Sequence, residues 1–291
     1  MPIPIDVTLP SLPPRPEESN KGTFGKALIV AGSRGMSGAA CLAGLGALRG
    51  GAGLVQVALP EGILPIVAAV EPSFLTVPLP EDDHGRLSRR ALGEILPLAE
   101  HATATAIGPG WGVSSDLLEL AHAIFTSVAG PLVIDADGLN ALSKVPGGWP
   151  KAPEGAPRVI TPHPGEFARL LRSDTKTVQA DRETLAAEFA ARHGLVVLLK
   201  GNRTVITDGQ RVAVNTTGNS GMATGGTGDV LTGLITALLA QGLAPFDAAR
   251  LGAHLHGLAG DLAALELSKP GLIASDLPRY LAKAWLQMGS G

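Results

Sequence analysis

Short, uniformly apolar runs recur along the chain and are separated by longer stretches rich in alanine and leucine. The apolar runs are interpreted as buried strands and lie at residues 27–30, 54–59, 132–134, 159–160 and 196–199. The longer stretches are interpreted as helices and lie at residues 38–49, 90–99, 115–126, 165–172, 178–193, 229–240 and 247–266. Strands without polar alternation are expected where helices cover both faces of a sheet. The pattern therefore predicts an α/β fold with a central, mostly parallel sheet and helices on both faces.

The rest of the pattern completes this picture. Two β-type runs, at residues 204–207 and 211–214, flank Asp208 and Gly209 and predict a hairpin. Residues 1–20 predict an extended, proline-rich lead-in, since they carry several prolines and no long apolar stretch. Neither an internal repeat nor a strong linker follows, so we expect a single domain over residues 21–288.

Composition excludes several classes of protein. Hydrophobic residues make up 45% of the 291 residues, which suffices for a sizeable core, and the formal net charge is −3 without a basic block. We therefore expect no nucleic-acid partner. No run approaches the length of about 18 apolar residues that a membrane helix needs. Cys41 is the single cysteine, so an internal disulfide and a cysteine-rich zinc site are impossible, and a cytoplasmic location is expected.

Residues 215–229 are the most informative segment and read N-T-T-G-N-S-G-M-A-T-G-G-T-G-D. Their glycines allow an anion to approach the backbone closely, and the segment runs directly into a predicted helix. The N–H groups at the start of that helix predict an anion site made by Gly225, Gly226, Thr227 and Gly228. Asp229 would lie beside the bound phosphoryl group, where a carboxylate can take a proton from an attacking hydroxyl.

Asp229 also has a simpler interpretation. A helix N-terminus stabilises an ionised carboxylate, which weakens it as a base, although phosphoryl transfer depends more on positioning and charge stabilisation than on base strength. The alternative is a glycine-rich turn in which Asp229 is an ordinary N-cap. The segment is not a Walker A loop, because no G-x-x-x-x-G-K-[ST] pattern occurs.

Four more polar segments follow predicted strands. They lie at residues 107–112, 135–140, 161–166 and 200–204. Ligands of open α/β sheets bind beyond the carboxyl ends of the strands, so these segments together predict a ligand site, although each alone could be a helix-starting turn.

Single side chains in these segments keep two interpretations. His163 is held between two prolines and could aim at a ligand, or could be a solvated loop residue. Lys200 could meet phosphate charge, or reach out to water. His254 and His256 are two residues apart on one helix, point to different faces and are interpreted as structural.

Taken together, these segments resemble the ADP/ATP-dependent NAD(P)H-hydrate dehydratases, a branch of the ribokinase superfamily. The resemblance extends from residue 21 to about residue 277. The motifs that carry it read K-G-T-F-G-K-A-L-I-V-A-G-S, S-G-A-A, L-R-G-G-A-G-L-V, I-G-P-G-W-G, V-I-D-A-D-G-L-N-A-L, T-P-H-P-G-E-F, L-K-G-N-R-T and G-M-A-T-G-G-T-G-D-V-L-T-G.

The resemblance implies a ribokinase-like fold and a repair reaction. Such an enzyme removes water from the S epimer of hydrated NADH or NADPH (NADHX or NADPHX) at the expense of ADP or ATP, with Mg²⁺. It also implies roles for individual residues. Ala39, Gly110, His163 and Asp229 would contact the hydrate. Lys200, Gly201, Asn202, Arg203, Thr204 and Gly228 would bind the nucleotide. Glu166 would help to organise Mg²⁺ through water.

Other expectations also follow from the resemblance. Many relatives carry an N-terminal epimerase domain, but only about 20 residues precede the first strand here, fewer than a domain needs. We therefore expect a separate epimerase, and a homotetramer. Two alternatives remain: a small-molecule kinase of the same superfamily, acting on a hydroxyethylthiazole, pyrimidine or pyridoxal-type alcohol, and a non-catalytic nucleotide-binding module.

Overall fold

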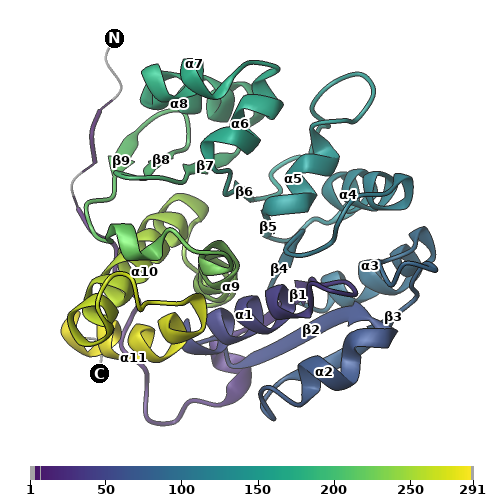
Figure 1. Ribbon diagram of the computed structural model, residues 1–291, viewed down its shortest axis with the longest axis horizontal. Coiled ribbons are helices and arrows are strands. Elements are labelled where there is room, and N and C mark those ends of the chain that lie inside the picture. Colours follow the sequence, from purple (N-terminus) through teal and green to yellow (C-terminus); the bar gives the residue numbers. More distant parts are fainter. Residues whose placement is uncertain (1–3, 7, 290–291) are drawn as a thin grey trace.

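The computed structural model describes residues 4–6 and 8–289, which are built around one nine-stranded sheet (Figure 1). The strand order is β3-β2-β1-β4-β5-β6-β7-β8-β9. The strands are β1 (Lys26–Val30), β2 (Leu54–Pro60), β3 (Leu75–Leu79), β4 (Ala104–Ile107), β5 (Leu132–Ile134), β6 (Arg158–Ile160), β7 (Val196–Leu199), β8 (Val205–Thr207) and β9 (Val212–Val214). Neighbours from β3 to β7 pair in parallel, whereas β8 and β9 are antiparallel. The predicted mostly parallel sheet and the hairpin are both confirmed.

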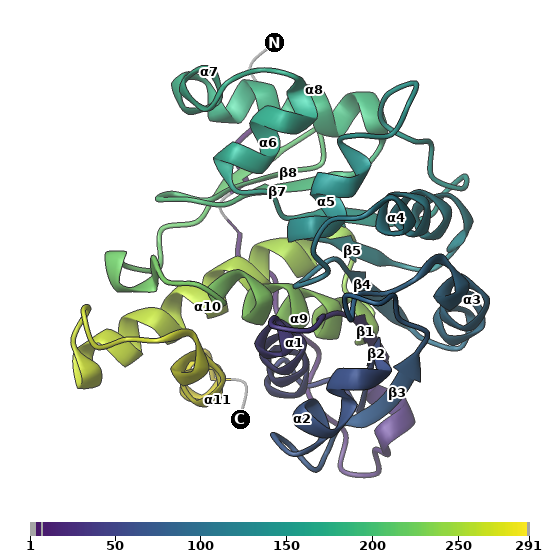
Figure 2. The ribbon, with the colours of Figure 1, turned by 45° about the vertical axis from the view of Figure 1, so that its right-hand side comes forward.

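Helices cover both faces of this sheet, as the two ribbon views show (Figures 1 and 2). One layer contains α1 (Ser37–Arg49), α2 (Leu64–Ala68), α9 (Thr227–Ala240), α10 (Pro245–Leu267) and α11 (Leu277–Gln287). The other contains α3 (Leu92–Glu100), α4 (Ser115–Ser127), α5 (Ala136–Leu142), α6 (Pro164–Leu171), α7 (Thr175–Ala180) and α8 (Arg182–His193). Short 3-10 helices are η1 (Lys21–Phe24), η2 (Glu61–Ile63), η3 (Arg89–Ala91), η4 (Ser220–Met222) and η5 (Ala274–Asp276).

Each helical layer forms its own hydrophobic core with the sheet. Successive side chains of a strand point to opposite faces. Within β1, Ala27 and Ile29 therefore belong to the core under α1 and α9, whereas Leu28 and Val30 belong to the core under α3 to α8. This double burial explains why the strands of the sequence are mostly apolar, with exceptions such as Gln56 in β2 and Arg158 in β6.

Two glycines allow α1 and α9 to approach each other very closely. A Cβ atom on Gly233 of α9 would lie 1.8 Å from the carbonyl oxygen of Ala43 in α1. A Cβ atom on Gly46 of α1 would lie 2.2 Å from the carbonyl oxygen of Val230 in α9. No side chain fits at such distances. The glycines thus fix the position of α9, which carries Asp229 in its first turn.

The predicted helix over residues 178–193 is wrong, because the structure divides this region into α7 and α8. Asp181 lies between them in a non-helical conformation, with φ −148° and ψ 64°, and its side chain accepts a hydrogen bond from the Thr184 backbone N–H at 3.4 Å. A carboxylate that caps a new helix in this way ends the preceding one. The strand β3 and the helices α2, α5 and α11 were not among the expected elements.

The described part of the lead-in lies against the domain. Ile5 forms a parallel β-bridge with Val212, and Asp6 pairs with Arg250 at 2.7 Å and with Arg211 at 3.3 Å. Residues 1–3 and 7 of the predicted lead-in lie outside the described residues. Among residues 4–6 and 8–289, none of the helices has the length and apolar character required to span a membrane.

Candidate active site

The structure brings the strand-end segments to one edge of the sheet. The N–H of Gly32, beyond β1, donates to the carbonyl of Pro109, beyond β4, at 2.8 Å. The N–H of Lys200, beyond β7, donates to the carbonyl of Pro162, beyond β6, at 2.8 Å. Parallel strands place their carboxyl ends together, so this proximity follows from the topology.

Ala39 and Gly110, two residues expected to contact the hydrate, lie side by side. Gly110 has a φ of +64°, and a Cβ atom built on it would lie 2.7 Å from the Cβ of Ala39. The carbonyl of Gly110 accepts a hydrogen bond from the buried Ser33 hydroxyl at 2.8 Å. Because residue 110 has no side chain, the loop after β4 packs directly against the first turn of α1, which brings these two residues together.

The glycine-rich segment leads directly into α9, as predicted. Gly226 is the residue before the helix and has a φ of +95°, in the left-handed region that glycine adopts readily. The Thr227 hydroxyl donates to the carbonyls of Met222 and Thr224, at 3.1 and 3.2 Å, and so holds the turn. The N–H groups of the first helical turn have no acceptor within a helix, so Thr227 and Gly228 present donors to an anion.

His256 supports this turn from below and was missed as a part of the site. Its Nε2 lies 2.9 Å from the carbonyl oxygen of Thr227. Burial lowers the pKa of His256 to about 4, so the ring is neutral at pH 7 and its Nε2–H donates to that carbonyl. The prediction that His256 is structural is compatible with this contact, but sequence spacing did not indicate which loop it holds.

Lys200 lies beneath the anion turn and pairs with a buried carboxylate. Its Nζ is 2.7 Å from Oδ1 of Asp135, a residue only 1% exposed, whose Oδ2 accepts from the Thr232 hydroxyl at 2.8 Å. A Cβ atom on Gly228 would lie 3.2 Å from the same Nζ. Burial alone would lower the pKa of Lys200, but Asp135 and Glu166 raise it overall, so the ammonium stays charged.

Asp229 is held in its protonated form to a higher pH than an ordinary aspartate. Burial, followed by the negative charge of Asp135, raises its pKa from 3.8 to about 7, although Lys200 opposes the shift. Asp137 and Glu166 add to the increase. The helix N-terminus was expected to stabilise the ionised carboxylate and weaken it as a base; this direction is corrected, because desolvation and neighbouring carboxylates outweigh it. A carboxylate with such a pKa is well matched to proton transfer near neutral pH.

His163 and Glu166 lock each other at the start of α6. The Nδ1 of His163 accepts from the N–H groups of Gly165 and Glu166, at 3.0 and 3.3 Å. In return, Oε2 of Glu166 accepts from the His163 N–H at 2.8 Å. This reciprocal cap fixes the imidazole, whose side chain is 51% exposed and accessible to a ligand.

The ionisation of this pair also follows from its surroundings. Burial, aided by the charge of Lys200, lowers the pKa of His163, so the ring is neutral at pH 7. Burial raises the pKa of Glu166, which is 5% exposed. Within residues 4–6 and 8–289, no group of three or more acidic, histidine or cysteine side chains could hold a metal ion. Glu166 therefore does not belong to a cage made of protein ligands alone.

The segment from Lys200 to Thr204 forms a tight turn that is held by Arg182. Gly201 and Arg203 have φ values of +140° and +56°. The guanidinium of Arg182 donates to the carbonyls of Asn202 and Leu199, at 2.6 and 2.8 Å. This arginine was missed, since its position near the start of a helix carries no sequence signal. Asp135 was also missed as a partner of Lys200, although its place after a strand marked its segment.

The chain is similar in sequence to known NAD(P)H-hydrate dehydratases and repair enzymes. The ADP-dependent (S)-NAD(P)H-hydrate dehydratase of Bacillus subtilis is 38% identical over 277 residues, which cover 94% of each chain. A bifunctional NAD(P)H-hydrate repair enzyme of Moorella thermoacetica is 46% identical over 275 residues, which cover 93% of this chain and 51% of the relative. The chain thus spans about half the length of the bifunctional relatives that it matches.

Solved structures give the same fold. A crystal structure of the ADP/ATP-dependent NAD(P)H-hydrate dehydratase of Bacillus subtilis, co-crystallised with ATP/Mg²⁺, matches with a TM-score of 0.82 and 34% identity, covering 99% of each chain. A ribokinase of Arabidopsis thaliana matches with a TM-score of 0.51 and 14% identity, which shows a shared fold alone; 88% of this chain and 98% of that one are covered. The model of one protein family, described as NAD(P)H-hydrate dehydratase, matches residues 27–283, so the chain belongs to that family.

Proposed function

We propose that this protein uses ADP or ATP to remove water from the S epimer of hydrated NADH or NADPH. The observation that carries the proposal is Asp229, whose pKa is raised to about 7 and which stands in the first turn of α9 beside the anion turn. This geometry supports a role for Asp229 as the proton acceptor beside the expected position of a phosphoryl group. Family membership and the dehydratase names of the relatives support the choice of substrate.

In the proposed reaction, the hydroxyl of the hydrate attacks the terminal phosphoryl group of the nucleotide. Asp229 accepts the hydroxyl proton, a new O–P bond forms, and AMP leaves ADP (or ADP leaves ATP). The C–O bond then breaks as phosphate departs, the neighbouring ring carbon loses a proton, and the dihydropyridine double bond returns. Phosphate is a better leaving group than hydroxide, which is the physical reason for the use of a nucleotide.

Other residues bind and orient the two substrates. The N–H groups of Gly225 to Gly228 stabilise the charge of the transferring phosphoryl group. Ala39, Gly110 and His163 hold the hydrate, and Lys200 to Thr204 hold the nucleotide. Because Lys200 is paired with Asp135, we propose that it acts through this fixed charge, with the backbone of its turn facing the nucleotide.

The site could bind Mg²⁺ through a small number of carboxylate oxygens, together with phosphate oxygens and water. The carboxylate oxygens beside the anion turn are hard donors, and magnesium usually binds proteins through one or two carboxylates, together with phosphates and water. Glu166 would hold it through water. When bound, the ion would neutralise phosphate charge.

The experiment that tests the proposal is the absorbance at 340 nm with purified NADHX or NADPHX, Mg²⁺ and either ADP or ATP. A nucleotide-dependent rise with release of phosphate is expected, and its size identifies the preferred nucleotide. Asp229→Asn should keep nucleotide binding and lose most of the turnover. Near-normal turnover of this variant would overturn the role of Asp229.

The same assay separates the alternatives. A kinase of this superfamily would yield a stable phosphorylated alcohol and no rise at 340 nm. A binding module would bind nucleotide without turnover. We also propose that a separate epimerase supplies the S epimer, that the protein works in the cytoplasm, and that it forms a homotetramer, which light scattering would test.

A further inference from the structure

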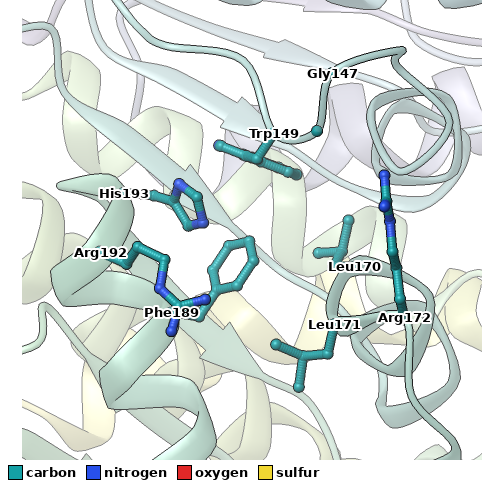
Figure 3. A pocket seen from close by; sticks show the side chains of 9 residues that line it. Gly147, Trp149, Leu170, Leu171, Arg172, Phe189, Arg192 and His193 are labelled. Carbon is teal, nitrogen blue, oxygen red and sulfur yellow. The ribbon is translucent and has the colours of Figure 1, made fainter.

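A cavity lies away from the anion turn, on the layer formed by α3 to α8. It has a volume of about 470 Å³ and opens between the loop after α5, the end of α6 and the end of α8 (Figure 3). None of the proposed catalytic, substrate or nucleotide residues lines it. Cavities of this size are large enough for a small organic molecule.

The floor of this cavity is aromatic. Trp149 packs edge-on against Phe189 and Phe125, with ring centroids 5.3 Å apart in both pairs. The ring of His193 lies 4.4 Å from that of Phe189. The chain has only 3% aromatic residues, so this cluster is an unusual concentration of them. Trp149 and His193 are partly exposed and offer ring surface to a ligand, whereas Phe189 is 4% exposed and packs behind them.

The rim of the cavity is positively charged. Arg172 and Arg192 lie on opposite sides of it, with Phe189 between them (Figure 3). Among the described residues, neither guanidinium forms a salt bridge or a side-chain hydrogen bond, and no acidic residue lines the cavity. Each arginine is near a helix C-terminus, where positive charge is favourable, but this does not explain the aromatic cavity between them.

The backbone holds Arg172 in a strained conformation. It has a φ of +52° at the end of α6, in the left-handed region where glycine is usual. An arginine at this place keeps its guanidinium beside the cavity at the cost of backbone strain, and strain of this kind tends to be retained at ligand sites.

We propose that this cavity binds a small organic anion with a flat ring, such as an aromatic carboxylate, sulfonate or phosphate ester. The ring packs against Trp149 and His193, and the acidic group lies between Arg172 and Arg192. Guanidinium groups bind such oxyanions through charge-assisted hydrogen bonds. The inference does not depend on the proposed dehydratase activity, since it uses other residues.

The test uses two probes with the same rings. 8-Anilinonaphthalene-1-sulfonate carries one sulfonate, whereas N-phenyl-1-naphthylamine carries none, and both become fluorescent in apolar sites. With ADP saturating the other site, the sulfonate should bind with one site per chain and more tightly than the amine. The double variant Arg172→Asn/Arg192→Gln should weaken sulfonate binding about tenfold or more and leave amine binding unchanged. Asparagine is chosen because it tolerates a positive φ.

A matched control removes two positive charges elsewhere. Arg90 on η3 and Arg279 on α11 are exposed, and Arg90→Gln/Arg279→Gln should leave sulfonate affinity unchanged. A change of less than twofold in the Arg172/Arg192 variant, an equal loss in the control, or equal affinities of the two probes would overturn the proposal.

A second measurement does not depend on these variants. The three tryptophan indole N–H groups give separate NMR signals, and that of Trp149 is buried without an acceptor among the described residues. The Trp149 signal, assigned by its loss in Trp149→Phe, should shift when the sulfonate binds. A shift confined to Trp111 or Trp285 would place the probe elsewhere and refute the site.

Discussion

Replacing Asp229 by asparagine is expected to stabilise the folded protein at alkaline pH, although the same change removes the proposed proton acceptor. The folded protein raises the pKa of Asp229 from 3.8 to about 7, mainly through burial and the charge of Asp135. The folded state therefore holds a proton that the unfolded chain has already released. Protonated aspartate and asparagine are both neutral and of similar size, so the two proteins should differ in stability only above pH 3.8, where the unfolded chain has released the proton of Asp229.

The sign and size of the effect follow from this difference in proton binding. Between pH 3.8 and about 7 the folded state binds more protons than the unfolded state, so wild-type stability falls as the pH rises through this window. Each pKa unit corresponds to about 1.4 kcal/mol, which gives an upper limit of about 4 kcal/mol above pH 7. Asp229 is partly exposed, and solvent screening lowers this value. We expect Asp229→Asn to be more stable by about 2 kcal/mol at pH 8 but only by about 0.8 kcal/mol at pH 5, because pH 5 lies in the lower part of the window between 3.8 and about 7.

Urea unfolding at pH 5 and pH 8, followed by circular dichroism, measures both differences. Asp174→Asn is a suitable control, because Asp174 accepts the Thr177 N–H at 2.8 Å and hydrogen bonds to Thr177 lower its pKa. The contribution of Asp174 to the stability of the folded protein is fully present above pH 3.8 and is lost only in more acidic solution. Asp174→Asn should therefore show the same small loss of stability at pH 5 and at pH 8. A stabilisation by Asp229→Asn that is absent at pH 8, or equal at pH 5 and pH 8, would refute the reasoning.

Three further outcomes are expected. The kcat/KM of the proposed dehydration should rise with pH and level off above about 7, since Asp229 must be ionised to accept a proton; a flat profile from about pH 5.5 to 8.5 would argue against it. His256→Leu removes the hydrogen bond to the carbonyl of Thr227 and should lower the free energy of unfolding in urea by about 1–3 kcal/mol. It should also weaken ADP binding in calorimetry, and an unchanged affinity for ADP would contradict the supporting role of His256. Gly233→Ala should destabilise the folded protein by about 3 kcal/mol or more, because the new Cβ would lie 1.8 Å from a carbonyl oxygen of α1. The control Gly93→Ala has open space around its Cβ and should not destabilise the protein. Similar unfolding midpoints for the two variants would refute the close packing of α1 and α9.

The sheet was predictable because burial on both faces leaves a direct mark on the sequence. Uniformly apolar strands such as β1 and β7 could be recognised, whereas β3 could not. This strand lies at the edge of the sheet, is only partly buried and contains Pro78, so its residues do not differ clearly from a loop. The break at Asp181 was missed because an acidic residue inside a helical pattern is compatible with both a continuous helix and a new cap.

The anion turn and Asp229 could be found from the sequence because they belong to one continuous segment of the chain. The side chains that contact this segment from distant parts of the chain could not be found in this way. Asp135 and Lys200 are 65 positions apart, and only the pairing of β5, β6 and β7 brings them to 2.7 Å. The pKa of Asp229 is raised first by burial and then by such distant charges, and an argument from the helix N-terminus alone includes neither of them.

The burial of α9 has a consequence for motion in the site. All residues from Val230 to Ala240 are buried, and the helix is clamped to α1 through Gly46 and Gly233. Amide hydrogens in such a helix exchange with solvent only when much of the domain opens, so they should be among the slowest in the protein. Asp229 is therefore attached to one of its most persistent elements, so motion within the site is left to the surrounding loops.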